Sequence, residues 1–374
     1  MLDSRLVLTR LLSPTRPLAL STLLLVSALC SPPAYAESTD SESAKADEDK
    51  SEPSMSPGLL PTLVAIVPGL ALHGLGHYVA GDRKTASRLF HWQLVGMGMM
   101  LGSALALAYS GGSRYGNELT IPTLIAGNGI FFNTFIADVY GSAGGGSVAS
   151  YQPAPQAAAS LGYGYIYDPQ FSYNHFAVAT GHLRWGQTHI DPSLWVAVGS
   201  NNQRARLPLG YGLLASDVGE YLEITGALTY HSFADSGFAT YLGEAGVGAR
   251  VEMSRLGAAL RGSFSTASVG LGWHHVDFDI PDGDGDSSAL LIAHFGYGFY
   301  LPAGGELEMY YQHRRDDFTS GTSPGSRNGS GFLGHYGAKL RKPLSDRFAL
   351  RLQSEIGAAW LLGSSLEVRL GGTP

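Results

Sequence analysis

Hydrophobic and polar residues alternate near the end of the chain, over residues 347–360. A period of two held for fourteen residues is about twice the length of a usual strand in a soluble protein. The pattern predicts one long β-strand with an apolar face and a charged face. The apolar parity carries Phe348, Leu350, Leu352, Ile356, Ala358 and Trp360, and the other parity carries Arg347, Arg351, Gln353, Glu355 and Gly357.

The same alternation recurs through most of the chain from about residue 157 onward. Counting the weaker runs gives about twelve segments, and ten to twelve strands is a size typical of a bacterial outer-membrane barrel. Many segments are long and carry aromatic residues near their ends, whereas the strands of a soluble β-sandwich are shorter. We therefore predict an all-β fold, an antiparallel transmembrane β-barrel. The strongest further segments are 220–231, 241–251, 289–301, 306–314 and 332–341.

The region before the alternating segments has a different, helical period and is largely apolar. Three segments stand out, at 59–75, 85–109 and 120–140. The second is long enough, at about 1.5 Å per residue, to cross a bilayer. The third carries Asn128, Asn133 and Asp138, so we expect it to pack against protein rather than lipid. An apolar α-helical segment therefore precedes the predicted barrel.

The N-terminus has the pattern of a secretory signal. Arginines precede the apolar run 18–29, and Ala34-Tyr35-Ala36 is a cleavage site of the A-x-A type. The only cysteine, Cys30, lies inside this segment, so the mature chain is predicted to carry no thiol. The predicted organisation is a signal peptide 1–36, a disordered acidic spacer 37–57, an apolar helical domain 58–143, a Gly/Pro-rich linker 144–156 and a β-barrel 157–374.

Composition agrees with a membrane barrel. Charged residues make up 15% of the chain, against about 25% in a usual soluble protein. The formal net charge of −7 and the scattered basic residues give no surface for nucleic acid. The expected location is the outer membrane of a Gram-negative cell, reached with a cleaved signal peptide. The expected partners are membrane lipid and the barrel-assembly machinery, with a small solute as a further candidate.

A short glycine-rich motif lies in the helical region. The motif has Pro68-Gly69, then Gly74-Leu75-Gly76-His77-Tyr78 and Gly81-Asp82, and it is closed much later by Asp138-Val139-Tyr140. These residues resemble P-G-x-G-[QH]-x-[YF]-x-x-G-D, the signature of a family of short bacterial helical-hairpin membrane domains found ahead of some Gram-negative barrels. The resemblance implies a helical hairpin and no particular chemistry. The function of that family is unknown.

Two groups of residues have the spacing of metal ligands. His73 and His77 share a helix face, but Gly74 stands where a metalloprotease motif has Glu, so packed histidines are expected. Asp282, Asp284 and Asp286 have the alternate spacing of a calcium loop. Its later Gly and Glu are replaced, so an acidic loop is expected and a weak calcium site stays open. No metal or cofactor is predicted.

The charged parity of a barrel strand should face the lumen, where opposite charges pair across neighbouring strands. We expect these pairs or the helical segment to fill the lumen; an open solute channel is the other possibility. The predicted lumen-facing residues are Glu223, Glu244, Arg250, Arg261, Glu306, Glu308, Lys339, Arg341, Arg351, Glu355 and Arg369.

The sequence thus favours a porin-like outer-membrane barrel with a structural or solute-channel role. Histidines are plentiful, but no nucleophile or acid stands in a recognisable motif, so no enzyme activity and no catalytic residue is predicted. Two alternatives remain: an inner-membrane-anchored periplasmic β-sheet binding domain, and a barrel enzyme acting on lipid or peptide.

Overall fold

The structure is a computed structural model that describes residues 57–110, 114–145, 151–169, 174–233, 237–279, 285–314, 317–320 and 334–371. The predicted signal peptide, the spacer up to residue 56, Asp282 and Asp284 lie outside the described residues. Of the three aspartates expected in an acidic loop, only Asp286 is described, and it is exposed at the start of a strand.

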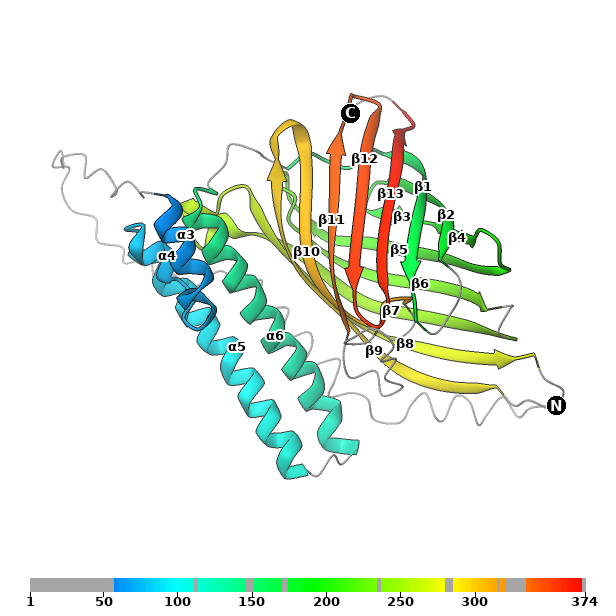
Figure 1. Cartoon of the computed structure of the whole chain (residues 1–374), viewed down its shortest axis with the longest axis horizontal. Coiled ribbons are helices and arrows are strands. Elements are labelled where there is room, and N and C mark those ends of the chain that lie inside the picture. Colours follow the sequence, from blue (N-terminus) through cyan, green and yellow to red (C-terminus); the bar gives the residue numbers. More distant parts are fainter. Residues whose placement is uncertain are drawn as a thin grey trace.

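The helical segment contains two long helices and a short cap. The cap consists of α3 (Leu59–Ile66), the 3-10 helix η1 (Pro68–Leu70) and α4 (Leu75–Val79), and the long helices are α5 (Arg83–Ser110) and α6 (Arg114–Ser142). They lie side by side as an antiparallel hairpin (Figure 1). A Cβ atom on Gly96 would lie 2.8 Å from the carbonyl oxygen of Gly127, and one on Gly127 would lie 2.7 Å from that of Gly96. These two glycines therefore allow the helix backbones to touch.

The rest of the described chain is one closed, antiparallel barrel. Neighbouring strands pair in sequence order, and β1 pairs with both β2 and β13, which closes the sheet. The strands are β1 (Ala157–Tyr167), β2 (His175–Trp185), β3 (Thr188–Ile190), β4 (Ser193–Ala197), β5 (Asn202–Ala215), β6 (Tyr221–Phe233), β7 (Phe238–Glu252), β8 (Ser263–Phe278), β9 (Asp286–Leu301), β10 (Gly305–His313), β11 (His335–Pro343), β12 (Phe348–Ile356) and β13 (Trp360–Arg369).

Strands β3 and β4 together form one wall position. Both pair with β2 and with β5, and the two pieces keep the same register. Asp191 and Pro192 interrupt the strand between them, because proline has no N–H to donate to the ladder. The thirteen strands therefore make a barrel of twelve positions, which confirms the predicted fold and strand number.

One detail of the strand prediction is wrong. Residues 347–360 do not form a single strand: they contain β12, a tight turn and the first residue of β13. The N–H of Gly357 bonds the carbonyl of Ala359, and the N–H of Ala358 bonds the carbonyl of Thr319. The turn residues 357–359 are small or apolar and buried against the barrel. The alternation of polar and apolar residues therefore gave no sign that the chain reverses direction there.

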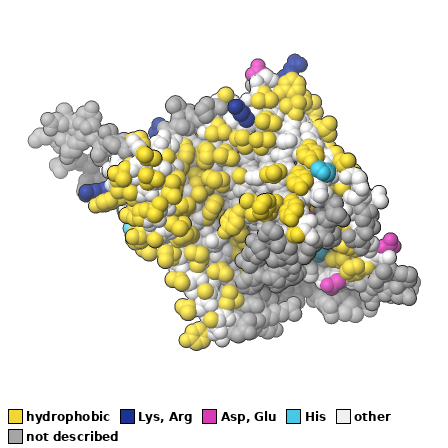
Figure 2. Space-filling model, in the orientation of Figure 1, with side chains coloured by type: hydrophobic (Ala, Val, Ile, Leu, Met, Phe, Trp, Pro, Cys, Tyr) yellow, Lys and Arg dark blue, Asp and Glu magenta, His cyan; other side chains and the backbone are white. Residues whose placement is uncertain are grey.

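The outer face of the wall is apolar and exposed. Leu228 on β6 is 64% exposed and Trp273 on β8 is 62% exposed. In Figure 2 hydrophobic side chains cover much of the visible wall, with few charges between them. So large an apolar surface is unfavourable in water and is what a membrane barrel presents to lipid. Other exposed apolar residues on the strands are Leu161, Ile224, Leu271, Ile356, Leu362 and Leu366.

The helical hairpin lies on the outside of this wall, beside β9 and β10 (Figure 1). A Cβ atom on Gly129 of α6 would lie 2.3 Å from the ring of Phe295 on β9. The side chain of Asn133 donates a hydrogen bond of 2.6 Å to Ser265 on β8. Phe295 and Ser265 have the parity opposite to that of the lumen-lining His294 and Thr266. The prediction that the helical segment could fill the lumen is therefore wrong.

Candidate functional site in the barrel lumen

The lumen holds two adjoining cavities, of about 620 Å³ and about 390 Å³. Small-molecule sites usually have volumes of this order. The larger cavity is lined by turn residues 216, 219 and 220 and by residues 151, 152, 154 and 155, which precede β1. It therefore lies toward the end of the barrel where β1 begins and β13 ends. The two cavities share His189, Tyr221, Glu223, Arg250, Glu306, Glu308 and Lys339.

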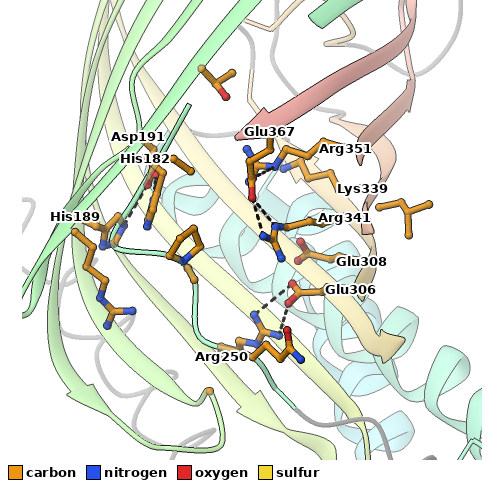
Figure 3. A pocket seen from close by; sticks show the side chains of 18 of the residues that line it. His182, His189, Asp191, Arg250, Glu306, Glu308, Lys339, Arg341, Arg351 and Glu367 are labelled. Carbon is orange, nitrogen blue, oxygen red and sulfur yellow. Dashed lines mark hydrogen bonds and ion pairs between the residues drawn. The ribbon is translucent and has the colours of Figure 1, made fainter. Parts of the chain in front are cut away.

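One wall of the larger cavity carries a ladder of ion pairs from β7 and β10 to β13 (Figure 3). Arg250 contacts Glu306 at 3.0 Å and lies 3.5 Å over the ring of Phe264. Glu367 accepts from Arg341 at 2.7 Å and lies 3.0 Å from Nε of Arg351. The ladder follows from strand register, since alternate residues of neighbouring strands face the same side of the sheet.

Two cations on this wall line the cavity. The ammonium of Lys339 lies 4.4 Å from the ring centre of Tyr310, and among the described residues no carboxylate lies within 4.0 Å of it. Arg351 lines the cavity and is 44% exposed, with its Nε 3.0 Å from Glu367. The nearby Glu308 is instead occupied by His294 and Thr266.

The facing wall carries histidines and carboxylates from β2, the β3–β4 interruption and β6 (Figure 3). Nδ1 of His182 is hydrogen-bonded to Oδ1 of Asp191. Nε2 of His189 lies 3.5 Å from Oδ2 of Asp191 and 3.8 Å from Glu223, which is too far for good hydrogen bonds. Glu223 has no hydrogen-bond partner among the described side chains. This wall therefore leaves carboxylate oxygens facing the cavity.

The opposite end of the lumen is filled by residues 317–320, part of the connection between β10 and β11. Phe318 is 2% exposed and packs against inward-facing residues of several strands. The main chain is held as well, since Thr319 accepts a hydrogen bond from the N–H of Ala358. We call residues 317–320 the barrier segment. The buried members of its apolar cluster are Ile166, Phe176, Val178, Ala197, Phe233, Ala359 and Leu361.

Charges fix the barrier segment beside Phe318. Asp317 is paired with Arg204 and with Arg314, whose Nε lies 3.1 Å away. Burial alone raises the pKa of the Asp317 carboxyl, but the guanidinium groups of Arg204 and Arg314 outweigh it and hold the pKa well below its ordinary value. Thr319 donates 2.7 Å to Glu355, which also accepts 2.7 Å from Tyr310. The segment therefore joins the wall through both apolar and ionic contacts.

The predicted lumen residues take three kinds of position. Glu355 contacts the barrier segment, since it accepts a hydrogen bond from Thr319. Arg369 lies on the same face of β13 as Glu367, at the end of the strand. Arg261 is exposed in the turn between β7 and β8, because two 3-10 helices occupy residues 253–260 where the alternation suggested a strand. The residues that line a cavity are Glu223, Glu244, Arg250, Glu306, Glu308, Lys339, Arg341 and Arg351.

Sequence reasoning missed the histidine wall and the barrier segment. The only sign of the first was Asp191-Pro192, a break inside an otherwise alternating segment. The second had no local sign, because Phe318 stands alone in a polar stretch. His182 and Asp191 would serve as an acid–base pair, but Nε2 of His182 contacts no hydroxyl or thiol in the described part of the chain.

His73 and His77 lie in the helical cap. Nδ1 of His73 is hydrogen-bonded to Thr134 at 2.7 Å, and Nδ1 of His77 to Asp138 at 2.8 Å. Both imidazoles are buried and bonded to different partners on α6. Within the described residues, no group of three or more potential ligands is arranged to hold a metal ion.

No protein-family model and no curated protein matches this sequence. Among solved structures, the chain is similar to the KdgM porin in complex with disordered oligogalacturonate, at 6% identity and a TM-score of 0.38, over 57% of this chain and 99% of that one. It is similar to the NanC porin at 8% identity and a TM-score of 0.36, over 57% and 100%. The translocator domain of the autotransporter NalP from Neisseria meningitidis matches at 10% identity and 0.34, over 59% and 90%.

Proposed function

We propose that this chain is an outer-membrane barrel of the channel type, in which a small solute carrying both a positive and a negative charge binds in the larger cavity. The observation that carries the proposal is the separation of opposite charge across that cavity. Lys339 and Arg351 present cationic groups on one wall, and Asp191 and Glu223 present carboxyl groups on the other, where their ion-pair partners in the described part of the chain are histidines.

Barrel order supports this facing arrangement. Asp191 and Glu223 belong to the β3–β4 position and to β6, whereas Lys339 and Arg351 belong to β11 and β12, several strands away in either direction around the barrel. A zwitterion spanning the cavity satisfies both walls at once, whereas a simple anion or cation leaves one wall without a partner. A charge left without a partner in a partly dehydrated site is costly.

The barrier segment supports a gated channel over a permanently open pore. Phe318 and Asp317 close the end of the lumen opposite the larger cavity. Passage of a solute then requires the barrier segment to leave its apolar cluster. In this proposal the larger cavity binds the solute, and movement of the barrier segment lets the solute pass through the opposite end of the lumen.

The proposed solute class is tested by block of ionic current in planar bilayers, with the barrier weakened by Phe318→Ala. Glycine and γ-aminobutyrate carry both charges, while acetate and ethylammonium carry one each. We expect at least one zwitterion to reduce the current at lower concentration than either single ion. The charges of one wall are neutralised in the double variant Lys339→Gln/Arg351→Gln, and those of the other in Asp191→Asn/Glu223→Gln. Each double variant should need about fivefold or more zwitterion for the same block, because a charge pair at 4 Å in water contributes about 1 kcal/mol.

Lys342→Gln is the matched control for the basic wall. Lys342 is exposed on β11 and has the parity opposite to Lys339 and Arg341, so its replacement should leave the block unchanged. Equal block by acetate and the zwitterions would overturn the assignment of solute class in favour of an anion site. Block that is unaffected by either pair of wall substitutions would overturn the assignment of the site to this cavity.

A further inference from the structure

The helical hairpin presents a long apolar surface that no part of the described chain covers. Both α5 and α6 are long and apolar enough to cross a membrane. Only 17% of the most apolar part of α5, and 33% of that of α6, is buried, which is unlike the core helix of a soluble protein. The exposed apolar residues of α5 are Phe90, Leu94, Val95, Leu101, Leu105 and Tyr109.

This surface is continuous with the lipid-facing wall of the barrel. Figure 2 shows hydrophobic side chains running from the hairpin onto the neighbouring strands with few charges between them. The inner side of the hairpin is fixed to the wall: Ile125 and Ala126 of α6 are buried against Ala293, Phe295 and Tyr311. A bilayer that surrounds the barrel must therefore also meet α5.

The hairpin also extends along the barrel wall, from the end where β9 finishes toward the end where β9 begins. Near its base, Ala137 packs in one cluster with Tyr297, and Arg88 donates 2.9 Å to the carbonyl of Leu256 in the β7–β8 turn. Toward its tip, Ile125 packs in one cluster with Ala293, four residues earlier on β9. At about 1.5 Å per residue, a helix of 28 residues is about 42 Å long and exceeds an apolar band of about 25 Å.

We infer that the α5–α6 hairpin spans the outer membrane alongside the barrel, with α5 in contact with lipid acyl chains and the hairpin tip on the loop side of the membrane. The polar groups inside the hairpin do not oppose this. Gln93 bonds the backbone of the cap and Asp138 bonds residues 74–77, so both are satisfied within the protein. Asn133 donates to Ser265, and its Oδ1 accepts no hydrogen bond from the described residues.

The sidedness follows from the barrel. Residues 302–304 and 344–347 are short connections at the end where β1 begins, and the long connection 314–334 lies at the other end. Outer-membrane barrels keep short turns in the periplasm and long loops outside the cell. The hairpin base contacts the β7–β8 turn on the short-turn side, so its tip lies on the outer side.

Single cysteines labelled with a membrane-impermeant maleimide test this placement in intact cells of a Gram-negative host, with Cys30→Ser as the background. Tyr109→Cys lies near the hairpin tip, where Tyr109 is 92% exposed. We expect it to be labelled in intact cells as readily as Asp279→Cys, at the loop end of β8. Asp346→Cys, in the β11–β12 turn, should be labelled only after the outer membrane is permeabilised.

Labelling of Tyr109→Cys only after permeabilisation, with Asp279→Cys labelled beforehand, would overturn the inference and leave the barrel intact. A second pair keeps the wall contact testable by itself. Asn133→Cys with Ser265→Cys should form a cross-link under oxidation or with a short bifunctional reagent, since Nδ2 of Asn133 and Oγ of Ser265 are 2.6 Å apart. Leu105→Cys with Ser265→Cys, on the exposed side of α5, should not. Equal yields from the two pairs would contradict a hairpin held against the wall.

Discussion

Replacing Phe318 with alanine is expected to raise the ratio of open to closed channels in planar bilayers by about 100-fold or more. Removing a buried phenylalanine side chain costs about 3–5 kcal/mol, and each 1.4 kcal/mol is a factor of about ten. Phe318 is 2% exposed, and its contacts are made only while the barrier segment lies in the lumen. Its loss therefore weakens the closed state and leaves the open state largely unaffected.

The control for this variant is Phe348→Ala. Phe348 lies on β12, is 41% exposed and faces outward, so the substitution removes a ring of the same size from the lipid side. Its single-channel record should match that of the wild type. If Phe318→Ala folds into the membrane and shows no more opening than Phe348→Ala, the barrier segment does not close the lumen.

The second large effect is expected in the helical cap. Asp138→Ala should speed hydrogen exchange of the amides of residues 74–77 by about 100-fold or more. Asp138 accepts 2.7 Å from the N–H of Gly74, 3.1 Å from that of His77 and 2.8 Å from the His77 ring, and it is fully buried. Each buried donor left without a partner costs about 1–3 kcal/mol, so roughly 3 kcal/mol or more is lost in all.

Asp82→Ala is the matched comparison. Asp82 caps α5 through one bond of 3.0 Å to the N–H of Thr85 at a partly buried site, so its loss should cost about 1 kcal/mol and change exchange only several-fold. Hydrogen exchange read by mass spectrometry on both variants gives the comparison. Equal exchange in the two variants would show that Asp138 does not hold the cap on α6.

The cap also explains why the glycine-rich motif is built as it is. Gly74 has a φ of +90°, and a Cβ atom there would lie 2.3 Å from the carbonyl oxygen of Ala86. Only glycine fits this left-handed turn against α5. The turn directs the N–H groups of Gly74, Gly76 and His77 at Asp138, which comes sixty-four residues after Gly74. The motif and the distant aspartate therefore form one structural unit.

The outline of the barrel could be predicted from sequence because the two faces of each strand meet different surroundings. Leu228 and Ile356 face outward, whereas Glu223 and Glu355 on the same strands face the lumen. Because successive side chains of a strand point to opposite faces, this difference appears in the sequence as a two-residue alternation of apolar and polar residues. The helices could be predicted for a similar reason. Their positions outside the wall could not, because Gly129 meets Phe295 only through the tertiary fold.

The lumen site was less predictable, since its residues come together through strand register and closure. His182 and Asp191 meet because β2 and the β3–β4 position form a hairpin with a particular offset. Phe318 finds its cluster on strands from both halves of the chain, and no local pattern marks it. The error at Arg261 has a local cause, since short 3-10 turns can imitate the alternation of a strand.

The most direct test of a closed barrel in the outer membrane compares unheated and boiled protein on a denaturing gel after the two membranes have been separated. We expect the protein in the outer-membrane fraction, with the unheated form migrating differently from the boiled one, because a closed sheet without edges resists detergent until it is heated. Recovery in the inner membrane with a single mobility would contradict the barrel and favour a periplasmic β-domain held by the helical hairpin.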